Sequence, residues 1–369
     1  MVRAGLGEDW DCLFANDIDD KKAACYATNW GSERLTVRDV GLLKPIDLTG
    51  DADLVWASFP CQDLSLAGDQ AGLKGDRSGT FWPFWRLMKG LAKEGRAPSI
   101  VVLENVCGAL TSHGGEDFAA IGSALTRGGY RFGAVVIDAV HFLPQSRPRL
   151  FIVGFRKDFE APPSLINDRL DPCWHPSNLA IAQKKLSPRS QDAWLWWSLP
   201  APAKRKSKFV DLIEDAPKGV VWHSEAETKR LLGMMSDVNS KKVEKAKRSG
   251  VRLIGGIYRR TRVDGNGQRA QRAEVRFDDV AGCLRTPVGG SSRQIILIVD
   301  GERVRSRLLS PREAARLMGL PDTYKLPQNY NEAYHLAGDG VAVPVVRFLA
   351  KHLIEPLVKV GLKRRKAAA

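Results

Sequence analysis

The chain has 369 residues and a mass of 40.7 kDa, with 44% hydrophobic and 27% charged residues. This composition is that of an ordinary globular protein, so it excludes a largely disordered chain, and the length predicts about two domains. No apolar run approaches a membrane span and the N-terminus has no signal-peptide core, which predicts a soluble cytoplasmic protein with no membrane partner. The six cysteines do not fall at metal-binding or disulfide-framework spacings, so we expect no metal site.

Positive charge is concentrated in one part of the chain. The 56 Lys and Arg residues against 42 Asp and Glu give a net charge of +14. The stretch from Lys204 to Arg276 contains 19 basic and 9 acidic side chains, a net +10. Such a block is typical either of a solvated surface or of a surface that binds a polyanion, and charge alone leaves both alternatives open.

Up to about residue 156, short apolar runs alternate with amphipathic stretches. Buried strands are predicted from the runs rich in Val, Ile, Leu and Phe, which are Cys12–Ala15, Leu54–Ser58, Ile100–Leu103, Val135–Asp138 and Leu150–Phe155. Helices are expected between them, most clearly at Asp20–Thr28, Phe81–Ala92 and Phe118–Leu125. This alternation predicts an α/β fold with a mainly parallel, doubly wound sheet.

The pattern is lost over residues 161–302, where we expect a second, smaller and irregular domain. Regular structure returns with a helix at Leu309–Gly319, for which Ser310 is the predicted N-cap and Glu313 completes a capping box. A last helical stretch is predicted at Val341–Leu357.

A cysteine and a glutamate follow two neighbouring predicted strands. Pro60 and Cys61 come just after Leu54–Ser58, and Glu104 comes directly after the next strand. Because ligands and catalytic groups gather at the carboxyl ends of strands, Cys61 and Glu104 are a candidate nucleophile and general acid. Taken alone, the cysteine is more typical of a buried apolar side chain and the glutamate of a cap or surface charge. The long glycine-containing loop 66–80 favours a functional lid.

Two arginines precede the strand Leu150–Phe155. Arg147 and Arg149 are two residues apart, so in extended chain their side chains would share one face. Two guanidinium groups on one face can hold a phosphate or the carbonyl group of a base. The alternative is a solvated pair at the start of a strand.

Together these motifs resemble the C5-cytosine DNA methyltransferase family. They are a Pro-Cys-Gln at Pro60, a Glu-Asn-Val at Glu104, a Gln-x-Arg-x-Arg at Gln145 and the block from Arg307 to Arg316. All four occur in the family's order, and the resemblance extends from about residue 10 to residue 350.

The resemblance implies a Rossmann-like, S-adenosylmethionine-dependent methyltransferase domain with a smaller target recognition domain. The implied boundaries are 1–160 for the catalytic domain, 161–332 for the target recognition domain and 333–369 for a segment that returns to the catalytic domain. The basic block would then meet DNA phosphates, which supply affinity without sequence information.

The resemblance also assigns catalytic roles. Cys61 would add to C6 of a cytosine flipped out of the duplex, and Glu104 would hydrogen-bond or protonate N3. Arg147 and Arg149 would orient the base and its sugar-phosphate.

The implied cofactor is S-adenosylmethionine. Asp17 would accept hydrogen bonds from the ribose hydroxyls, Ile18 would pack on the adenine, and Asp39 would contact the adenine edge. The other implied cofactor-binding residues are Val40, Pro60, Phe81 and Asp339. For Asp17 and Asp19, simple N-capping of the following helix is an alternative.

Two features depart from the family's pattern. The opening strand and its Phe-x-Gly-x-Gly loop have no counterpart, and the segment from Met1 to Gly7 matches the helix that follows them. Because that strand would be central, we expect the edges of its neighbouring strands to be unpaired. We also expect either that the recorded start lies downstream of the true one or that the chain is a fragment. Asp339 replaces the family's Asn, which puts a charge near the cofactor's carboxylate.

The leading hypothesis is a monomeric enzyme that methylates C5 of cytosine in double-stranded DNA, associated with the nucleoid through DNA. It would be part of a restriction-modification system with a cognate restriction endonuclease. A tRNA-cytosine methyltransferase is a close alternative. From other classes, the chain could be a truncated, catalytically inactive nucleic-acid-binding remnant, or a thiol hydrolase using Cys61, for which no histidine lies in a companion motif.

Overall fold

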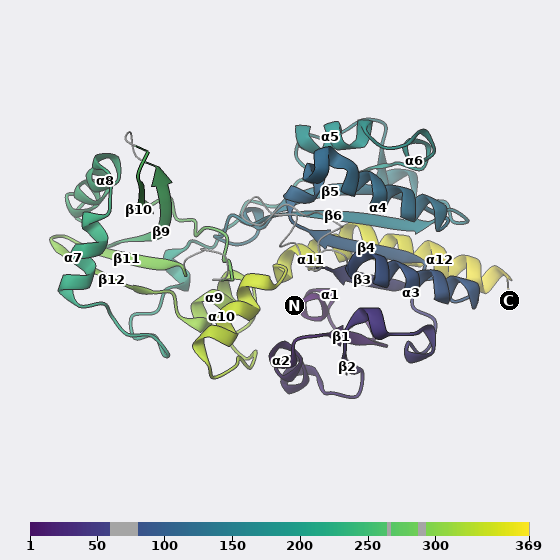
Figure 1. Ribbon diagram of the computed structural model, residues 1–369, viewed down its shortest axis with the longest axis horizontal. Coiled ribbons are helices and arrows are strands. Elements are labelled where there is room, and N and C mark those ends of the chain that lie inside the picture. The colour runs from purple at the N-terminus through teal and green to yellow at the C-terminus, as the bar shows by residue number, and fades with distance from the viewer. Residues whose placement is uncertain (60–79, 264–266, 287–292, 369) are drawn as a thin grey trace. The chain divides into compact units, whose positions relative to one another are not determined.

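The computed structural model describes residues 1–59, 80–263, 267–286 and 293–368. The chain divides into two compact units, each built from segments distant in sequence (Figure 1). The larger unit comprises Val2–Asp138, Pro148–Pro202 and Val345–Ala369, and the smaller unit comprises Met1, Ala139–Arg147 and Ala203–Pro344. Within the described ranges, no helix is both long and apolar enough to cross a membrane.

The main sheet of the larger unit has four strands in the order β3-β4-β6-β5. These are β3 (Leu54–Ser58), β4 (Ile100–Asn105), β5 (Tyr130–Asp138) and β6 (Pro148–Arg156). All four coincide with predicted strands, with β5 longer than expected. β3 and β4 are parallel, whereas β6 is antiparallel to both of its neighbours. The segment 139–147 between β5 and β6 is too short for the helical crossover that a parallel pair requires.

A second, two-stranded parallel sheet pairs β1 (Ala15–Asp17) with β2 (Leu35–Val37), and α2 (Asp20–Trp30) connects them. β1 lies later than the strand predicted at 12–15. The side-chain amide of Asn16 explains the shift, because it donates to the carbonyls of Thr36 and Arg38 at 2.9 and 2.8 Å and ties these residues to β2. Among the described strands neither β1 nor β2 pairs with β3, so the two sheets are separate.

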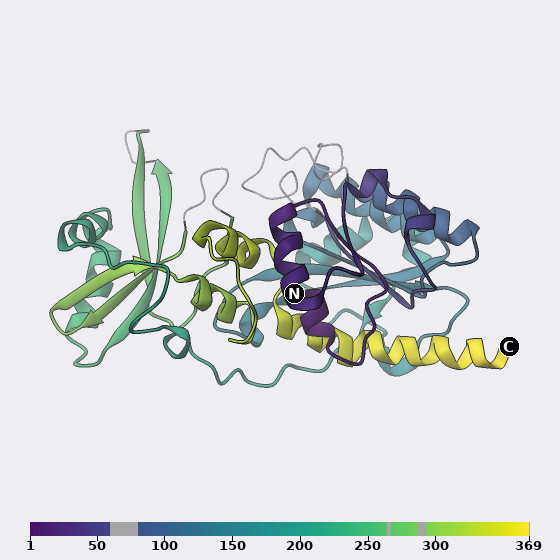
Figure 2. The same cartoon turned by 90° about the horizontal axis from the view of Figure 1, so that it is seen from below.

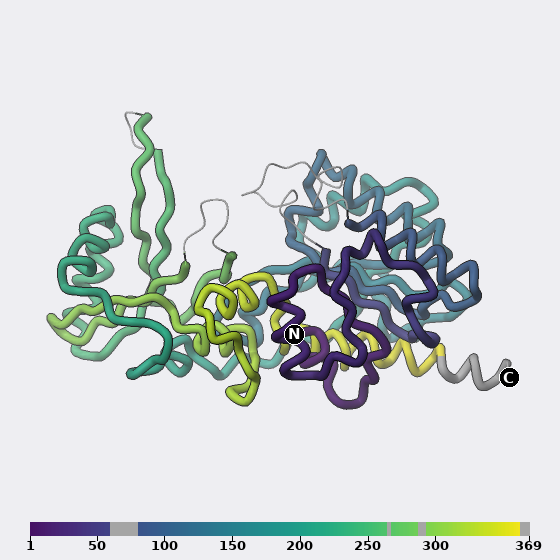
Figure 3. The backbone as a smooth tube through the Cα atoms, turned by 60° about the horizontal axis from the view of Figure 1, so that its bottom comes forward, coloured from purple at the N-terminus to yellow at the C-terminus, as the bar shows by residue number. Residues whose placement is uncertain are grey.

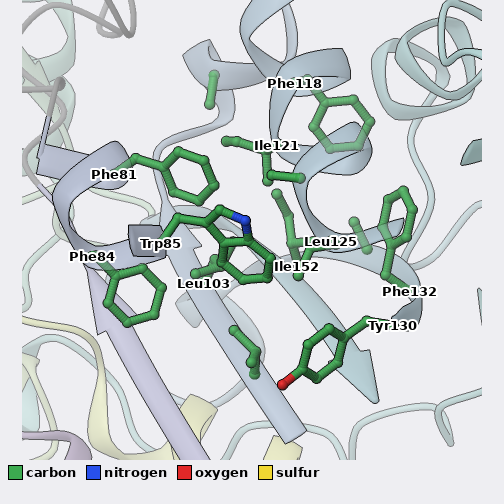
Figure 4. Packing of buried hydrophobic residues seen from close by; sticks show 14 of the residues in the cluster. Phe81, Phe84, Trp85, Leu103, Phe118, Ile121, Leu125, Tyr130, Phe132 and Ile152 are labelled. Atoms are coloured by element: carbon green, nitrogen blue, oxygen red, sulfur yellow. The ribbon is translucent and has the colours of Figure 1, made fainter. Parts of the chain in front are cut away.

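Aromatic and aliphatic side chains of two helices cover the main sheet and form its core (Figure 4). The helices are α3 (Phe81–Lys93) and α4 (Glu116–Arg127), close to their predicted ranges. On α3 the buried residues recur at helical spacing, at Phe81, Phe84, Trp85, Leu87, Met88 and Leu91. The indole of Trp85 meets the ring of Tyr130 edge-on, with centroids 6.1 Å apart. This close packing fixes the strand ends that carry the candidate site residues.

The remaining elements of the larger unit are short, apart from the C-terminal helix. They are α1 (Val2–Leu6), β7 (Ile166–Asn167) paired with β8 (Trp196–Trp197), α5 (Ser177–Lys184) and α6 (Pro188–Asp192). The predicted last helical stretch is present as α11 (Val343–Leu349), a π-helical turn at Ala350–Ile354, and α12 (Glu355–Ala368).

The smaller unit contains a four-stranded antiparallel sheet in the order β10-β9-β11-β12, where the sequence predicted no regular fold. Its strands are β9 (Leu253–Val263), β10 (Arg269–Arg276), β11 (Ile295–Asp300) and β12 (Arg303–Leu308). Two helices, α7 (Glu225–Gly233) and α8 (Asp237–Lys247), accompany it. A second core joins these elements and includes Leu231, Val243, Ile257, Ala273, Val275 and Leu297.

Two further helices, α9 (Pro311–Leu317) and α10 (Tyr330–Asp339), follow the sheet. The predicted capping box is confirmed, because the Glu313 amide donates to Ser310 Oγ at 3.2 Å and the Ser310 amide donates to Glu313 Oε2 at 2.7 Å. Glu313 also forms a fully buried ion pair with Arg307, which the sequence did not predict.

Candidate active site

Two aspartates lie at the carboxyl ends of β1 and β2. Asp17 is the last residue of β1, and its Oδ1 accepts from the Asp19 amide at 2.9 Å. Asp19 is the N-cap of α2 and accepts from two backbone amides of that helix. Asp39 follows β2, and its Oδ1 accepts from the Gly41 amide at 2.7 Å. Asp19 therefore caps α2 and Asp39 caps the short turn Val40–Leu42, whereas Asp17 caps no helix.

The apolar residues near these aspartates differ in exposure. The side chain of Ile18 is 67% exposed, and Val40 packs partly buried against the core. Phe81 is fully buried at the start of α3, where its ring lies 4.9 Å from that of Trp82 and 6.1 Å from that of Trp85. Ile18 is thus the apolar surface available to a ligand beside Asp17, and Phe81 is a core residue.

The carboxyl ends of β3 and β4 lie side by side. The parallel register pairs Ser58 with Glu104, and the Asn105 side-chain amide donates to the Phe59 carbonyl at 3.4 Å. The predicted nucleophile Cys61 and the preceding Pro60 lie outside the described residues. The described chain thus brings the end of β3 to Glu104 at a point three residues before Cys61.

Glu104 and Arg149 form a largely buried ion pair. Arg149 Nε lies 3.3 Å from Glu104 Oε1, and the two side chains are only 14% and 9% exposed. Glu104 pairs with Phe151 in the antiparallel register of β4 and β6, so Arg149, two residues earlier on β6, is its diagonal neighbour on the same face. The pair is therefore held by the sheet itself.

A second thiol lies near this pair. Burial raises the pKa of Cys107, and the positive charge of Arg149 only partly offsets that effect, while Asp138 adds to it. Cys107 is thus expected as a neutral thiol at pH 7, which makes it a poor nucleophile. Sequence reasoning did not single out Cys107, which follows the Glu-Asn-Val motif, or Asp138, which is the last residue of β5.

Arg147 has a different environment from Arg149. It belongs to the smaller unit, is 1% exposed, and donates to the carbonyls of Leu284, Gly338 and Gly340 at 2.7 to 2.8 Å. The sequence predicted that both arginines face one substrate group, but in the described chain the two side chains contact different partners. The Gly338 and Gly340 carbonyls flank Asp339, so Arg147 fixes the chain around that residue.

Asp339 ends α10, and its Oδ1 accepts a hydrogen bond from the Thr286 hydroxyl. The predicted site residues thus fall into three groups in the described chain. Asp17, Ile18, Asp39 and Val40 lie at the β1 and β2 ends, Glu104 and Arg149 lie on the main sheet, and Arg147 and Asp339 lie in the smaller unit. Within the described residues, no group of three or more His, Cys, Asp or Glu side chains could hold a metal ion.

The larger unit is a Rossmann-like α/β domain whose polar groups gather at the carboxyl ends of strands, the usual place of a ligand site in such sheets. The sequence model of the C-5 cytosine-specific DNA methylase family matches residues 2–355, and the chain belongs to that family of enzymes. The family resemblance predicted from the sequence is therefore confirmed.

Individual relatives are distant but nearly full-length. The type II methyltransferase M.HhaI of Haemophilus parahaemolyticus is 24% identical over 347 residues, which cover 93% of this chain and 87% of that protein. The type II methyltransferase M.HaeII of Haemophilus aegyptius is 26% identical over 361 residues, covering 96% and 90%. The crystal structure of S. pombe Dnmt2 methyltransferase is similar in fold, with a TM-score of 0.55, 18% identity and coverage of 94% and 92%. The predicted Rossmann-like methyltransferase fold is thus confirmed.

Proposed function

We propose that this protein transfers a methyl group from S-adenosylmethionine to C5 of a cytosine flipped out of double-stranded DNA. The observation that carries the proposal is the buried Glu104–Arg149 pair, which lies beside the end of β3. β3 ends three residues before Cys61, and the chain belongs to the C-5 cytosine-specific DNA methylase family. A flipped base is required because C5 and C6 are inaccessible to a side chain inside a stacked duplex.

Cys61 supplies the nucleophile in this mechanism. Its thiolate forms a bond to C6, and the electron pair of the C5–C6 double bond moves onto the ring, so that C5 becomes nucleophilic. After methylation the C5 proton passes to water, the N3 proton returns to Glu104 and the C6–S bond breaks, which restores the aromatic ring and the thiolate. Covalent addition thus divides one difficult substitution into two easier steps.

Glu104 and Arg149 act on the charge that develops during addition. As the thiolate adds, negative charge spreads to N3, and Glu104, which enters this step as the neutral acid, donates its proton there. The carboxylate that this transfer leaves lies 3.3 Å from the Arg149 guanidinium, which stabilises it. Because the pair is largely buried, little water screens the attraction, and the stabilisation is larger than for a surface pair.

The ends of β1 and β2 fit the proposed cofactor. When bound, S-adenosylmethionine supplies an electrophilic methyl group on a sulfonium. Asp17 and Asp39 each use Oδ1 to accept a backbone amide, and among the described residues neither Oδ2 has a hydrogen bond, so it can accept from ribose or adenine. The exposed Ile18 side chain offers an apolar surface to the adenine ring. Asp339, which the family resemblance also assigns to the cofactor, lies in the smaller unit, where its side chain accepts from the Thr286 hydroxyl and the flanking carbonyls bind Arg147.

The decisive experiment uses DNA in which 5-fluorocytosine replaces cytosine, because fluorine at C5 cannot leave as a proton and the adduct persists. With labelled S-adenosylmethionine we expect a covalent protein–DNA product, its loss in Cys61→Ser, and at least 100-fold slower methylation of ordinary DNA in Glu104→Gln. Cys173→Ser is the matched control, since Cys173 is exposed and lies outside the proposed site. An adduct that survives Cys61→Ser, or label transfer to tRNA but not to duplex DNA, would refute the proposal.

We further propose that the protein works as a monomer and as the modification partner of a cognate restriction endonuclease. Its relatives M.HhaI and M.HaeII are named type II methyltransferases, which supports the second part. Sedimentation with and without a duplex tests the first part, and protection of methylated plasmid from a nuclease encoded nearby tests the second.

A further inference from the structure

A cysteine and a buried arginine are in contact in the smaller unit, which Figures 2 and 3 show from two further sides. Arg147 Nη1 donates to Cys283 Sγ at 3.2 Å. The same nitrogen donates to the Leu284 carbonyl at 2.8 Å, and Nη2 donates to the carbonyls of Gly338 and Gly340, both at 2.7 Å. One guanidinium group thus joins the cysteine to the end of α10.

Buried contacts fix the position of this guanidinium beside the sulfur. Arg147 is only 1% exposed. Gln145, which is 0% exposed, accepts from the Leu284 amide at 3.2 Å and so ties the two segments together a second time. A methyl group added at Gly338 would lie 2.9 Å from the backbone three residues after Cys283, so the end of α10 packs closely on the same segment.

The contact with Arg147 changes the chemistry of the cysteine. A guanidinium is always protonated, and its charge and its hydrogen bond both stabilise a negative sulfur, so they favour the thiolate over the thiol. Cys283 is also partly exposed, which allows a small molecule such as hydrogen peroxide to reach it. Thiolate character and access are the two conditions for a reactive cysteine.

Three other described cysteines have less favourable surroundings. Burial raises the pKa of Cys107. Burial and the charge of Asp171 raise the pKa of Cys173, although its side chain is exposed, and Cys25 is buried. Exposure alone would make Cys173 the most reactive of these thiols, whereas the arginine contact favours Cys283.

We propose that Cys283 is a modification site, at which a peroxide oxidises the thiolate to a sulfenic acid and thereby displaces Arg147 from the end of α10. The sulfur bonds to one peroxide oxygen and the O–O bond breaks, so that the sulfur loses two electrons and the peroxide gains them. The second oxygen leaves as hydroxide, which forms water with the proton that the thiol has released.

The displacement follows from the geometry of the contact. The new oxygen replaces the sulfur as the acceptor for Arg147, and a separation of 3.2 Å between sulfur and nitrogen leaves no room for an oxygen atom between them. The guanidinium therefore has to move, which weakens its hydrogen bonds to the carbonyls of Gly338 and Gly340. The inference goes beyond the proposed function and bears on it only through Asp339, which the family resemblance assigns to the cofactor.

The first test compares two thiols of the wild-type protein without cofactor or DNA. The protein is treated with hydrogen peroxide at pH 7 in the presence of dimedone, which traps sulfenic acids. The tryptic peptides 277–285 and 170–184 then report Cys283 and Cys173 separately by mass spectrometry. We expect Cys283 to be labelled about tenfold faster or more, although Cys173 is the more exposed. Equal rates, or faster labelling of Cys173, would overturn the proposal.

A second measurement examines the role of the guanidinium. Alkylation by iodoacetamide depends on the thiolate, so its rate rises with pH until the thiol is fully ionised. We expect this rise to be complete at a lower pH for Cys283 than for Cys173. Coincident curves would contradict a thiolate stabilised by Arg147.

Hydrogen exchange tests the displacement. Exchange of the backbone amides of residues 338–342 is followed before and after peroxide treatment in wild type and in Cys283→Ser, the matched control that keeps the shape of the side chain but cannot be oxidised. We expect at least about fivefold faster exchange in oxidised wild type only. Unchanged exchange in oxidised wild type, or an equal increase in Cys283→Ser, would overturn the displacement of Arg147. Neither result depends on methyl transfer, so failure of the proposed function leaves this test intact.

Discussion

The buried Arg307–Glu313 pair in the smaller unit allows a direct test of what stabilises that unit. Both side chains are 0% exposed. Glu313 Oε1 accepts from Arg307 Nη2 at 2.6 Å and from the Glu214 amide at 2.8 Å, and Oε2 accepts from Arg307 Nη1 at 2.8 Å and from the Ser310 amide at 2.7 Å. Four hydrogen bonds, donated by three residues, thus converge on one carboxylate.

Replacing Glu313 by Gln keeps the shape and removes the charge, which leaves the Arg307 guanidinium buried without a counter-charge. Breaking a buried pair in this way costs about 3–5 kcal/mol, a large part of a typical unfolding free energy of about 5–15 kcal/mol. The double variant Arg307→Met/Glu313→Gln removes both charges. It should therefore be more stable than Glu313→Gln alone by about 1 kcal/mol or more, despite carrying one more substitution.

Urea unfolding followed by far-ultraviolet circular dichroism measures these differences. If the unfolding free energy falls with urea concentration at the same slope for every variant, the variants unfold to similar states. The exposed change Arg303→Gln, at the start of the same strand β12, is the control and should alter stability by less than about 0.5 kcal/mol. A loss below about 1 kcal/mol for Glu313→Gln, or a double variant no more stable than Glu313→Gln, would show that the pair does not contribute as its geometry indicates.

Two further predictions concern the larger unit. His175 Nδ1 accepts from the Asp171 amide at 2.8 Å and burial lowers the pKa of His175 to about 4, so its neutral form stabilises the fold above pH 6.5. As pH falls from about 6.5 to 4 the unfolded chain binds the proton first, so up to about 3 kcal/mol of unfolding free energy is lost. His175→Asn keeps a hydrogen-bond acceptor and should reduce this dependence of stability on pH, which thermal melts across that pH range measure. Gly133→Ala should destabilise by about 1–3 kcal/mol, because its methyl group would meet the Leu195 carbonyl. The control Gly233→Ala, in α7 of the smaller unit with no atom within 4 Å, should not destabilise the protein in the same thermal melts.

Long apolar runs explain why much of the larger unit could be predicted. β4 is buried on both sides, as is most of β6, and α3 has six buried residues at helical spacing, so apolar runs and periodicity locate them. β1 was placed too early because its last two residues, Asn16 and Asp17, are polar. Their strand conformation depends on hydrogen bonds to β2, a contact that local hydrophobicity does not encode.

The sheet of the smaller unit could not be predicted for a related reason. Beyond Tyr258, β9 reads Arg-Arg-Thr-Arg-Val, a run without an apolar face. Only pairing with β10 makes it a strand, and such pairing connects residues that sequence periodicity treats separately. This part of the strand lacks an apolar pattern because its side chains are exposed and pack against no core.

The two arginines of the Gln-x-Arg-x-Arg motif show where sequence reasoning about the site reaches its limit. Alternation would place Arg147 and Arg149 on one face only if both lay within the strand, but β6 begins at Pro148. Arg149 is inside the strand, and the register carries it to Glu104. Arg147 lies before the strand, and its guanidinium is occupied by three backbone carbonyls, two of which flank Asp339. A substituted Arg147 would therefore alter the chain around Asp339, whereas a substituted Arg149 would alter the charge beside the proposed proton donor, so the two arginines have separable roles in one motif.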